Sequence, residues 1–191
     1  DLVDIVSKNG ALLLNIGPRP DGTIPEQDEA VLLEIGRWLN VNAEAIYGTR
    51  PWKVYGEGPT QGRRGGFSET SDRPFAAADI RFTTRGETLY AIALGWPPSG
   101  SLRIKSLASR GTAADCKVTD AQLLGHAERL EWAQTAAGLS VKLPLEKPCD
   151  HAFALKISGQ NLRPAEHAKP MGHRRSNGVQ MGRRTAHSKG S

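Results

Sequence analysis

The sequence is poor in the residues that build metal centres and phosphate-binding loops. It has two cysteines and five histidines in 191 residues, and none of them falls at the spacing of a metal-ligand set. The glycine-rich segment 62–66 reads Gly-Arg-Arg-Gly-Gly, but the Lys-Ser/Thr pair and the helix that follow a phosphate loop are missing. We therefore expect neither a metal nor a cofactor.

Two cysteines are also too few to reveal a disulfide framework. Cys116 and Cys149 could form a bridge, as in secreted proteins, but two cysteines alone do not establish a pair. A free buried thiol is an equally good interpretation of Cys149. The pairing stays open at this point.

The C-terminal end lacks aromatic residues and has an excess of positive charge. Residues 161–191 contain seven Lys and Arg, one acidic residue and no Phe, Tyr or Trp, which leaves 18 basic and 19 acidic residues in 1–160. Because this composition cannot build a core, we predict a disordered basic tail over residues 159–191. A changed reading frame after the last strand is one possible origin.

The tail could attract nucleic acid or an anionic membrane surface through Arg174-Arg175 and Arg183-Arg184. Neither stacking aromatics nor a folded reading module accompanies these pairs, so a nucleic-acid partner is disfavoured. We expect no membrane partner.

Residues 12–26, which read LLLNIGPRPDGTIPE, combine the signals of a strand, a turn and a helix start. The run Leu12–Ile16 is apolar without alternation, which is typical of a parallel strand buried on both faces. Proline and an Asp-Gly pair in residues 17–22 predict a turn. Thr23 and Glu26 have capping-box spacing, and Pro25 lies in the first helical turn.

Helices are predicted on both sides of this strand. The first lies within residues 1–10 and ends at Asn9-Gly10. The second begins near residue 26 and carries an apolar stripe that consists of Val31, Leu32, Ile35, Trp38, Leu39 and Asn42. This order indicates a parallel sheet or barrel. Because one strand cannot make a sheet and Asp1 is not a methionine, we expect that the chain begins partway through a larger domain.

The second half of the sequence predicts an antiparallel β-sandwich. Alternating residues from Ile80, a turn at Arg85-Gly86 and the run at 88–94 predict a hairpin. Further strands are predicted at 102–105, 139–143 and 153–157 and around Trp132. The glycine and proline content of 56–66 indicates a linker. The predicted division is 1–55 for the end of a barrel, 56–79 for a linker or loop, 80–158 for the sandwich, and 159–191 for the tail.

Two long stretches resemble a known family. The sequences LVDIVSKNGALLLNIGPRPDGTIPE and LLEIGRWLNVNAEAIYGTRPW resemble the end of the catalytic barrel of glycoside hydrolase family 29 α-L-fucosidases. The sequences IRFTTRGETLYAIALGWP and LPLEKPCDHAFALKI resemble their β-rich C-terminal domain. The resemblance covers roughly residues 1–158 and is weaker over 57–79. It implies an α/β plus all-β fold: the final strand and helices of a (β/α) barrel, then a small antiparallel β-sandwich. Ala11 departs from the family, where many relatives have Asn.

The resemblance also implies an activity for the complete enzyme. Such an enzyme hydrolyses terminal α-L-fucosides on glycans or glycosides with retention, using two carboxylates and no cofactor. The family's Trp-Phe-Asp strand, which carries the nucleophile, is absent from this sequence. We therefore predict that the isolated chain is inactive, and we assign no catalytic, substrate-binding or metal residue. The family implies a secreted, periplasmic or lysosomal location.

Several residues remain as weaker candidates for function. Asp21 lies in the loop on the face where barrels carry their active sites, but Asp-Gly geometry is the favoured interpretation. Asn15 could order a neighbouring group, although an Asn at a strand end more often satisfies backbone groups. Packing is likewise favoured over sugar stacking for Trp38, Trp52 and Trp96. The alternative function is a noncatalytic β-sandwich that binds carbohydrate or packs against a barrel.

Overall fold

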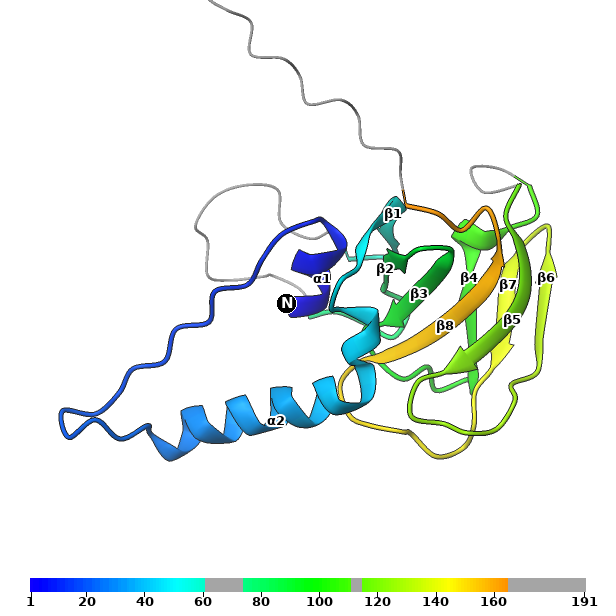
Figure 1. Cartoon of the computed structure of the whole chain (residues 1–191). Helices are drawn as coiled ribbons and strands as arrows, with labels where there is room; N and C mark the ends of the chain where they lie inside the picture. Colours follow the sequence, from blue (N-terminus) through cyan, green and yellow to red (C-terminus); the bar gives the residue numbers. More distant parts are fainter. Residues whose placement is uncertain (61–73, 111–114, 165–191) are drawn as a thin grey trace, which may run out of the picture.

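The computed structural model describes residues 1–60, 74–110 and 115–164. These residues form two α-helices, two short 3-10 helices and eight strands (Figure 1). The helical elements are α1 (Leu2–Ser7), α2 (Glu26–Asn42), η1 (Ala43–Ala45) and η2 (Lys105–Leu107). The strands are β1 (Arg50–Glu57), β2 (Ile80–Arg85), β3 (Thr88–Ala93), β4 (Ser101–Ile104), β5 (Lys117–Leu123), β6 (Trp132–Thr135), β7 (Gly138–Lys142) and β8 (Phe153–Gln160).

The strands form two antiparallel sheets that pack as a sandwich. The larger sheet has the order β1-β2-β3-β8-β5, and the smaller has the order β4-β7-β6. The apolar side chains between them form one core, which includes Phe82, Leu89, Ile104, Leu139 and Leu155, all at most 1% exposed. The predicted antiparallel sandwich is therefore present, with its core between the two sheets.

The central strands of the larger sheet are buried on both faces. Leu89, Ala91 and Ala93 of β3 face the sandwich core, whereas Tyr90 and Ile92 pack in a second cluster with the helices. Because side chains alternate along a strand, a strand covered on both sides must be apolar at successive positions. The two-sided apolar run of β3 therefore reflects a layer of helices over the sheet.

Both predicted helices are present, but the predicted capping box is not. Asn9, two residues beyond α1, has a φ of 65°, which fits the predicted stop at Asn9-Gly10. At the start of α2 the N-cap is Pro25, and no side chain caps it. The hydroxyl of Thr23 instead donates to Asp21 at 2.7 Å.

Residues 12–16 form no strand in this structure, contrary to the sequence prediction. Residues 8–24, called the arm below, contain no helix or strand and are exposed throughout. The arm and the first turns of α2 extend away from the sandwich (Figure 1). An extended segment becomes a strand only when a neighbour supplies a hydrogen-bonding ladder, and no described strand pairs with the arm.

Among the other predicted strands, the hairpin is confirmed, and its strands β2 and β3 pair in register from Ile80 with Ala93 to Arg85 with Thr88. The remaining predictions correspond to β4, β6, β7 and β8. Sequence reasoning missed β1 and β5. Strand β1 runs across the predicted domain boundary at residue 55 and pairs with β2 of the larger sheet. The division into domains as a whole stays a prediction.

Two predicted segments lie largely or partly outside the described residues. Of the glycine- and proline-rich residues 56–66 of the predicted linker, residues 61–66 are not described. The predicted start of the disordered tail at residue 159 is wrong, because β8 continues to Gln160 and Leu162 is fully buried in the sandwich core. Residues 165–191 lie outside the described part of the chain.

Candidate functional site

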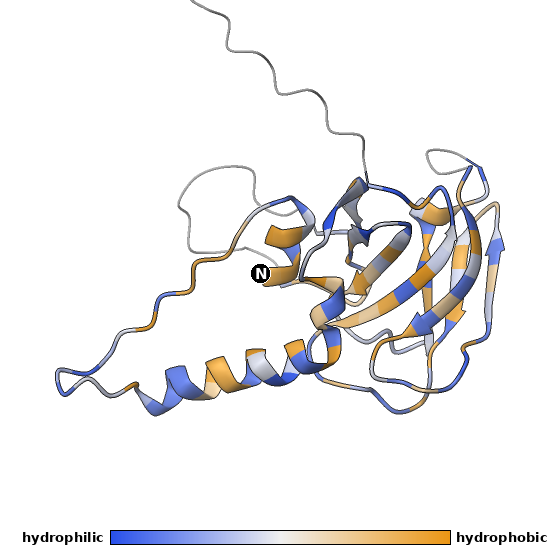
Figure 2. Cartoon of the chain, viewed as in Figure 1, coloured by the Kyte–Doolittle hydropathy of each residue, from blue (hydrophilic) through white to orange (hydrophobic). Residues whose placement is uncertain are grey.

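The arm and the adjoining part of α2 expose an unusual number of apolar side chains. Leu13 is 86% exposed, and Leu33 on α2 is 55% exposed. The exposed apolar group consists of Leu12, Leu13, Leu14, Ile16, Ile24, Val31 and Leu33. Figure 2 shows these hydrophobic stretches along the arm and on α2, away from the sandwich. Exposed apolar side chains that gather in one region indicate an interaction surface.

The polar candidates of the arm make only local contacts. Asp21 accepts hydrogen bonds from the backbone N–H of Thr23 at 3.0 Å and from its hydroxyl at 2.7 Å. Both bonds lower the pKa of the Asp21 carboxyl below its usual value, and the bond from the backbone N–H is that of an Asx turn. The carboxylate of Asp21 is therefore engaged within its own turn. Asn15 is exposed.

A buried ion pair attaches α1 to the larger sheet. Arg81 of β2 is 1% exposed, and its Nε donates to Asp4 Oδ1 of α1 at 2.5 Å. Lys8 Nζ donates to the other oxygen of the same carboxylate at 2.6 Å. Burial raises the pKa of Asp4, but the hydrogen bonds from Lys8 and Arg81 outweigh burial and hold this pKa below its usual value.

The end of α2 docks on the same sheet through a different set of contacts. The indole N–H of Trp38 donates to the carbonyl of Ala152 at 2.7 Å, and both groups are buried. Asn42 donates to Trp38 O at 3.1 Å and to Cys149 Sγ at 3.4 Å. The hydroxyl of Thr83 on β2 donates to Ala45 O at 2.7 Å. These contacts hold the last turns of α2 and the 3-10 helix after it.

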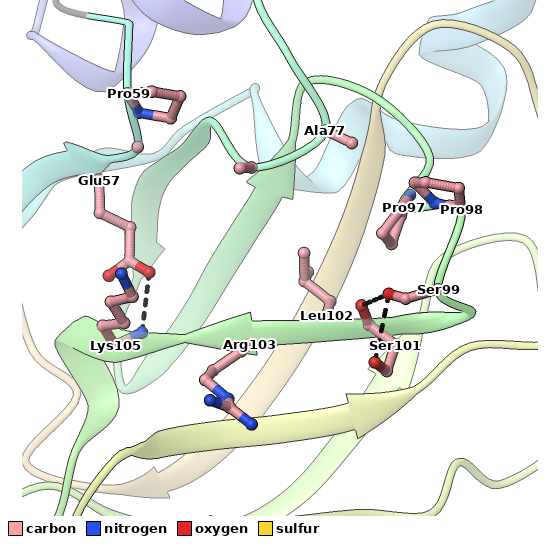
Figure 3. Close-up of a pocket in the computed structure, with 12 residues that line it drawn as sticks. Glu57, Pro59, Ala77, Pro97, Pro98, Ser99, Ser101, Leu102, Arg103 and Lys105 are labelled. Carbon is pink, nitrogen blue, oxygen red and sulfur yellow. Dashed lines mark hydrogen bonds between the residues drawn. The ribbon is translucent and has the colours of Figure 1, made fainter.

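A groove of about 670 Å³ lies beside β4 (Figure 3). Its walls come from the end of β1, the segment before β2, the loop after β3, and β4 itself. The carboxylate of Glu57 is already engaged, because it accepts hydrogen bonds from the backbone N–H groups of Lys105 and Ser106 at 2.8 and 2.6 Å. The lining residues are Glu57, Gly58, Pro59, Ala77, Ala78, Pro97, Pro98, Ser99, Ser101, Leu102, Arg103 and Lys105.

None of the four tryptophans lines this groove. Trp38 is in the helix-facing cluster, as predicted. Trp52 is 3% exposed and meets Phe82 edge-on with ring centres 5.1 Å apart. Trp96 meets Phe153 in the same way at 4.6 Å, and Trp132 lies on β6 against the sandwich core. Each tryptophan therefore packs in or against one of the two apolar clusters.

The cysteines of the described residues are both free. Burial raises the pKa of the Cys116 thiol and of the Cys149 thiol, which disfavours the reactive thiolate. Within the described part of the chain, no group of three or more His, Cys, Asp and Glu is placed to hold a metal ion. No helix there is long and apolar enough to cross a membrane.

Comparisons with known proteins match both halves of the chain. The family model "Alpha-L-fucosidase" matches residues 1–44, and "Alpha-L-fucosidase C-terminal domain" matches residues 73–158. The tissue α-L-fucosidase of Homo sapiens is 34% identical over 164 residues, which are 83% of this chain and 30% of that protein. The α-L-fucosidase of Branchiostoma floridae is 32% identical over 163 residues, 83% of this chain and 31% of that protein.

A solved structure likewise matches most of this chain but only a minor part of its own length. The crystal structure of Thermotoga maritima α-fucosidase in complex with fucose superposes with a TM-score of 0.58 at 29% identity. It is matched over 81% of this chain and 32% of its own length. The chain thus spans about a third of the length of the relatives that it matches.

Proposed function

We propose that this chain belongs to the α-L-fucosidase family and is the C-terminal portion of a glycoside hydrolase that removes terminal α-L-fucose from glycans or glycosides. Along the chain, the "Alpha-L-fucosidase" model matches first and the "Alpha-L-fucosidase C-terminal domain" model follows it. The antiparallel sandwich is the structural counterpart of the second match. We also propose that the complete enzyme is secreted, periplasmic or lysosomal, as the family resemblance implies.

The proposed reaction is hydrolysis with retention at the anomeric carbon. Retaining glycosidases place two carboxyl groups about 5–5.5 Å apart, one as nucleophile and one as acid and base. The Asx-turn role of Asp21 leaves no candidate pair in the arm. In this proposal both carboxylates come from the part of the relatives' length that this chain does not span, and the isolated chain is inactive.

The exposed apolar group is the observation that carries the proposal. Leu12, Leu14 and Ile16 are between 36% and 47% exposed, and Leu13 is 86% exposed, although their run is typical of a strand buried on both faces. We infer that the upstream barrel strands and helices cover them. Residues 12–16 would then form the final barrel strand, and the turn at 17–23 would lie on the active-site face, at the carboxyl end of that strand.

A chimera tests this function directly. The part of Thermotoga maritima α-fucosidase that precedes its match to this chain is fused ahead of residue 1, and hydrolysis of 4-nitrophenyl α-L-fucoside is measured. We expect activity from the chimera and none from the 191-residue chain. In the chimera, Leu13→Asp should lower activity at least tenfold, because a charge would enter the barrel wall.

Leu145→Asp is the matched control, since Leu145 is fully exposed and lies outside the exposed apolar group. It should leave the activity of the chimera unchanged. Hydrolysis by the 191-residue chain would contradict the inactivity of the isolated chain. A folded but inactive chimera would contradict the proposed function.

A noncatalytic sugar-binding module is not favoured by the groove. Protein sites for small ligands fall in the range of about 300–1,000 Å³, so the groove is large enough. Among the described residues, however, its lining contains no aromatic ring on which a sugar could stack. No observation therefore supports this second function.

A further inference from the structure

Helix α1 is too short to hold its own position. It has six residues, and no side chain caps its N-terminus. Isolated helices shorter than about 12–15 residues are marginal in water. The place of α1, and of the arm that follows it, must therefore be set by contacts with the sheet.

Arg81 is the charged group that makes this contact. Besides Asp4, its guanidinium donates to the carbonyls of Ile80 at 3.1 Å and Thr60 at 3.3 Å. The rings of Tyr55 and Phe75 lie 5.7 and 5.1 Å from it. A buried cation needs an anionic partner, and among the described residues Asp4 is the one carboxylate paired with it.

The surrounding backbone is shaped to admit this arginine. A Cβ atom at Gly56 of β1 would lie 2.7 Å from Arg81 Cδ and 2.5 Å from Ile80 O. Only glycine at residue 56 leaves space for the side chain at that distance. The arginine is therefore accommodated by β1 as well as paired by α1.

The same carboxylate also fixes the point where the arm begins. Asp4 Oδ2 accepts the hydrogen bond from Lys8, the C-cap of α1, and the Lys8 ammonium lies 5.0 Å from the Tyr55 ring centre. At the other end of the arm, α2 is fixed by Trp38 and Ala152. The start of the arm is thus held directly on the larger sheet, whereas on its other side the contact is made only in the last turns of α2.

We propose that Arg81 of the sandwich is a positioning residue for the active site, because through Asp4 it holds α1 and the start of the arm in the place from which residues 12–16 enter the barrel. The proposal rests on the proposed function. It gives the C-terminal sandwich a part in catalysis without any contact with the sugar. The orientation of the turn at 17–23 depends on Arg81 in this arrangement.

Hydrogen exchange on the 191-residue chain tests the attachment without any assay of activity. In Asp4→Asn, which keeps the side-chain volume, amides of α1 should exchange at least tenfold faster, while amides of β3 and β8 stay protected. Asp115→Asn is the control, because Asp115 pairs with Lys53 at the surface. It should change neither region.

Two results would overturn the proposal. Unchanged exchange of α1 in Asp4→Asn would show that the ion pair does not hold the helix. Loss of protection in β3 and β8 as well would show that the pair supports the whole fold rather than the position of α1. Arg81→Lys, which keeps the charge but loses the guanidinium geometry, should release α1 to a smaller extent.

The fucosidase chimera supplies the second readout. Arg81→Lys should lower kcat about tenfold and change KM less than twofold, because misplacement of a catalytic-face loop affects the transition state more than ground-state binding. An unchanged kcat would overturn the positioning role. If the chimera without substitutions is inactive, the proposed function fails, and the exchange result still decides whether Arg81 holds α1.

Discussion

The sandwich and the arm use similar residues with opposite outcomes. Leucines in β3, β7 and β8 are at most 1% exposed, whereas Leu13 in the arm is 86% exposed. Both sides of the sandwich core lie within the described residues, whereas the apolar side chains of the arm stay exposed. The difference teaches that similar apolar residues are buried only where a second packing surface lies within the described structure, and we propose that the rest of the complete enzyme supplies that surface for the arm.

The largest expected effect on stability comes from shortening a core side chain of the sandwich, compared with the same kind of change in the arm. Phe82→Ala removes a fully buried ring that meets Trp52 and should lower the free energy of unfolding by about 3–5 kcal/mol. Leu13→Ala, the matched change in the arm, should alter it by less than about 0.5 kcal/mol. Urea unfolding followed by tryptophan fluorescence measures both. Equal losses would mean that the arm is packed in solution.

The second effect concerns the junction between α2 and the sandwich. Trp38→Phe removes the hydrogen bond to Ala152, worth about 1 kcal/mol, and loosens the contact that covers Cys149. We expect iodoacetamide to modify Cys149 about fivefold faster, with Cys116 as the internal control. Trp132→Phe on β6 should change neither rate. Faster modification of both cysteines in Trp38→Phe would indicate general unfolding instead.

A smaller effect should appear on acidification at α1. The folded-state pKa of Asp4 is depressed, because the hydrogen bonds from Lys8 and Arg81 outweigh burial. The stabilisation is therefore complete well above the unfolded pKa of about 3.9 and is lost as pH falls through the lower folded pKa. The α1 amide NMR shifts should move toward random-coil values below about pH 4. In Asp4→Asn this acid step should be absent.

The smallest effect concerns an ion pair on the surface of the sandwich. Lys142 and Glu131 meet at 3.2 Å, with side chains 67% and 79% exposed. Glu131→Gln should change the free energy of unfolding by less than about 0.5 kcal/mol in urea. A loss comparable to that of Phe82→Ala would mean that surface charge, rather than the shared core, distinguishes the sandwich from the arm.

Much of the fold could be predicted because its signals are local. The apolar stripe of α2 and the turn at Gly86, whose φ is 61°, are properties of neighbouring residues. Strand β1 was missed because its apolar residues do not alternate cleanly and Pro51 weakens the signal. Pro51 is tolerated there because β1 lies at the edge of its sheet.

Less of the candidate site could be predicted from the sequence. The turn role of Asp21 follows from its Asp-Gly pair and holds in the structure. The groove could not be predicted, because its walls come from four segments between residues 57 and 105. Arg81 alternates with apolar neighbours and would normally point to solvent. Its burial depends on Asp4, which lies 77 positions away in the sequence.

The sequence by itself determined the helices, most strands, the sandwich and the family resemblance, because periodicity and turn chemistry act between residues a few positions apart. Only the tertiary structure decided that residues 12–16 stay extended and exposed, that the central strands of the larger sheet are covered on both faces, and that Arg81 faces α1. These features depend on distant partners. A strand needs a second strand for its ladder, and a buried charge needs an opposite charge that no local pattern specifies.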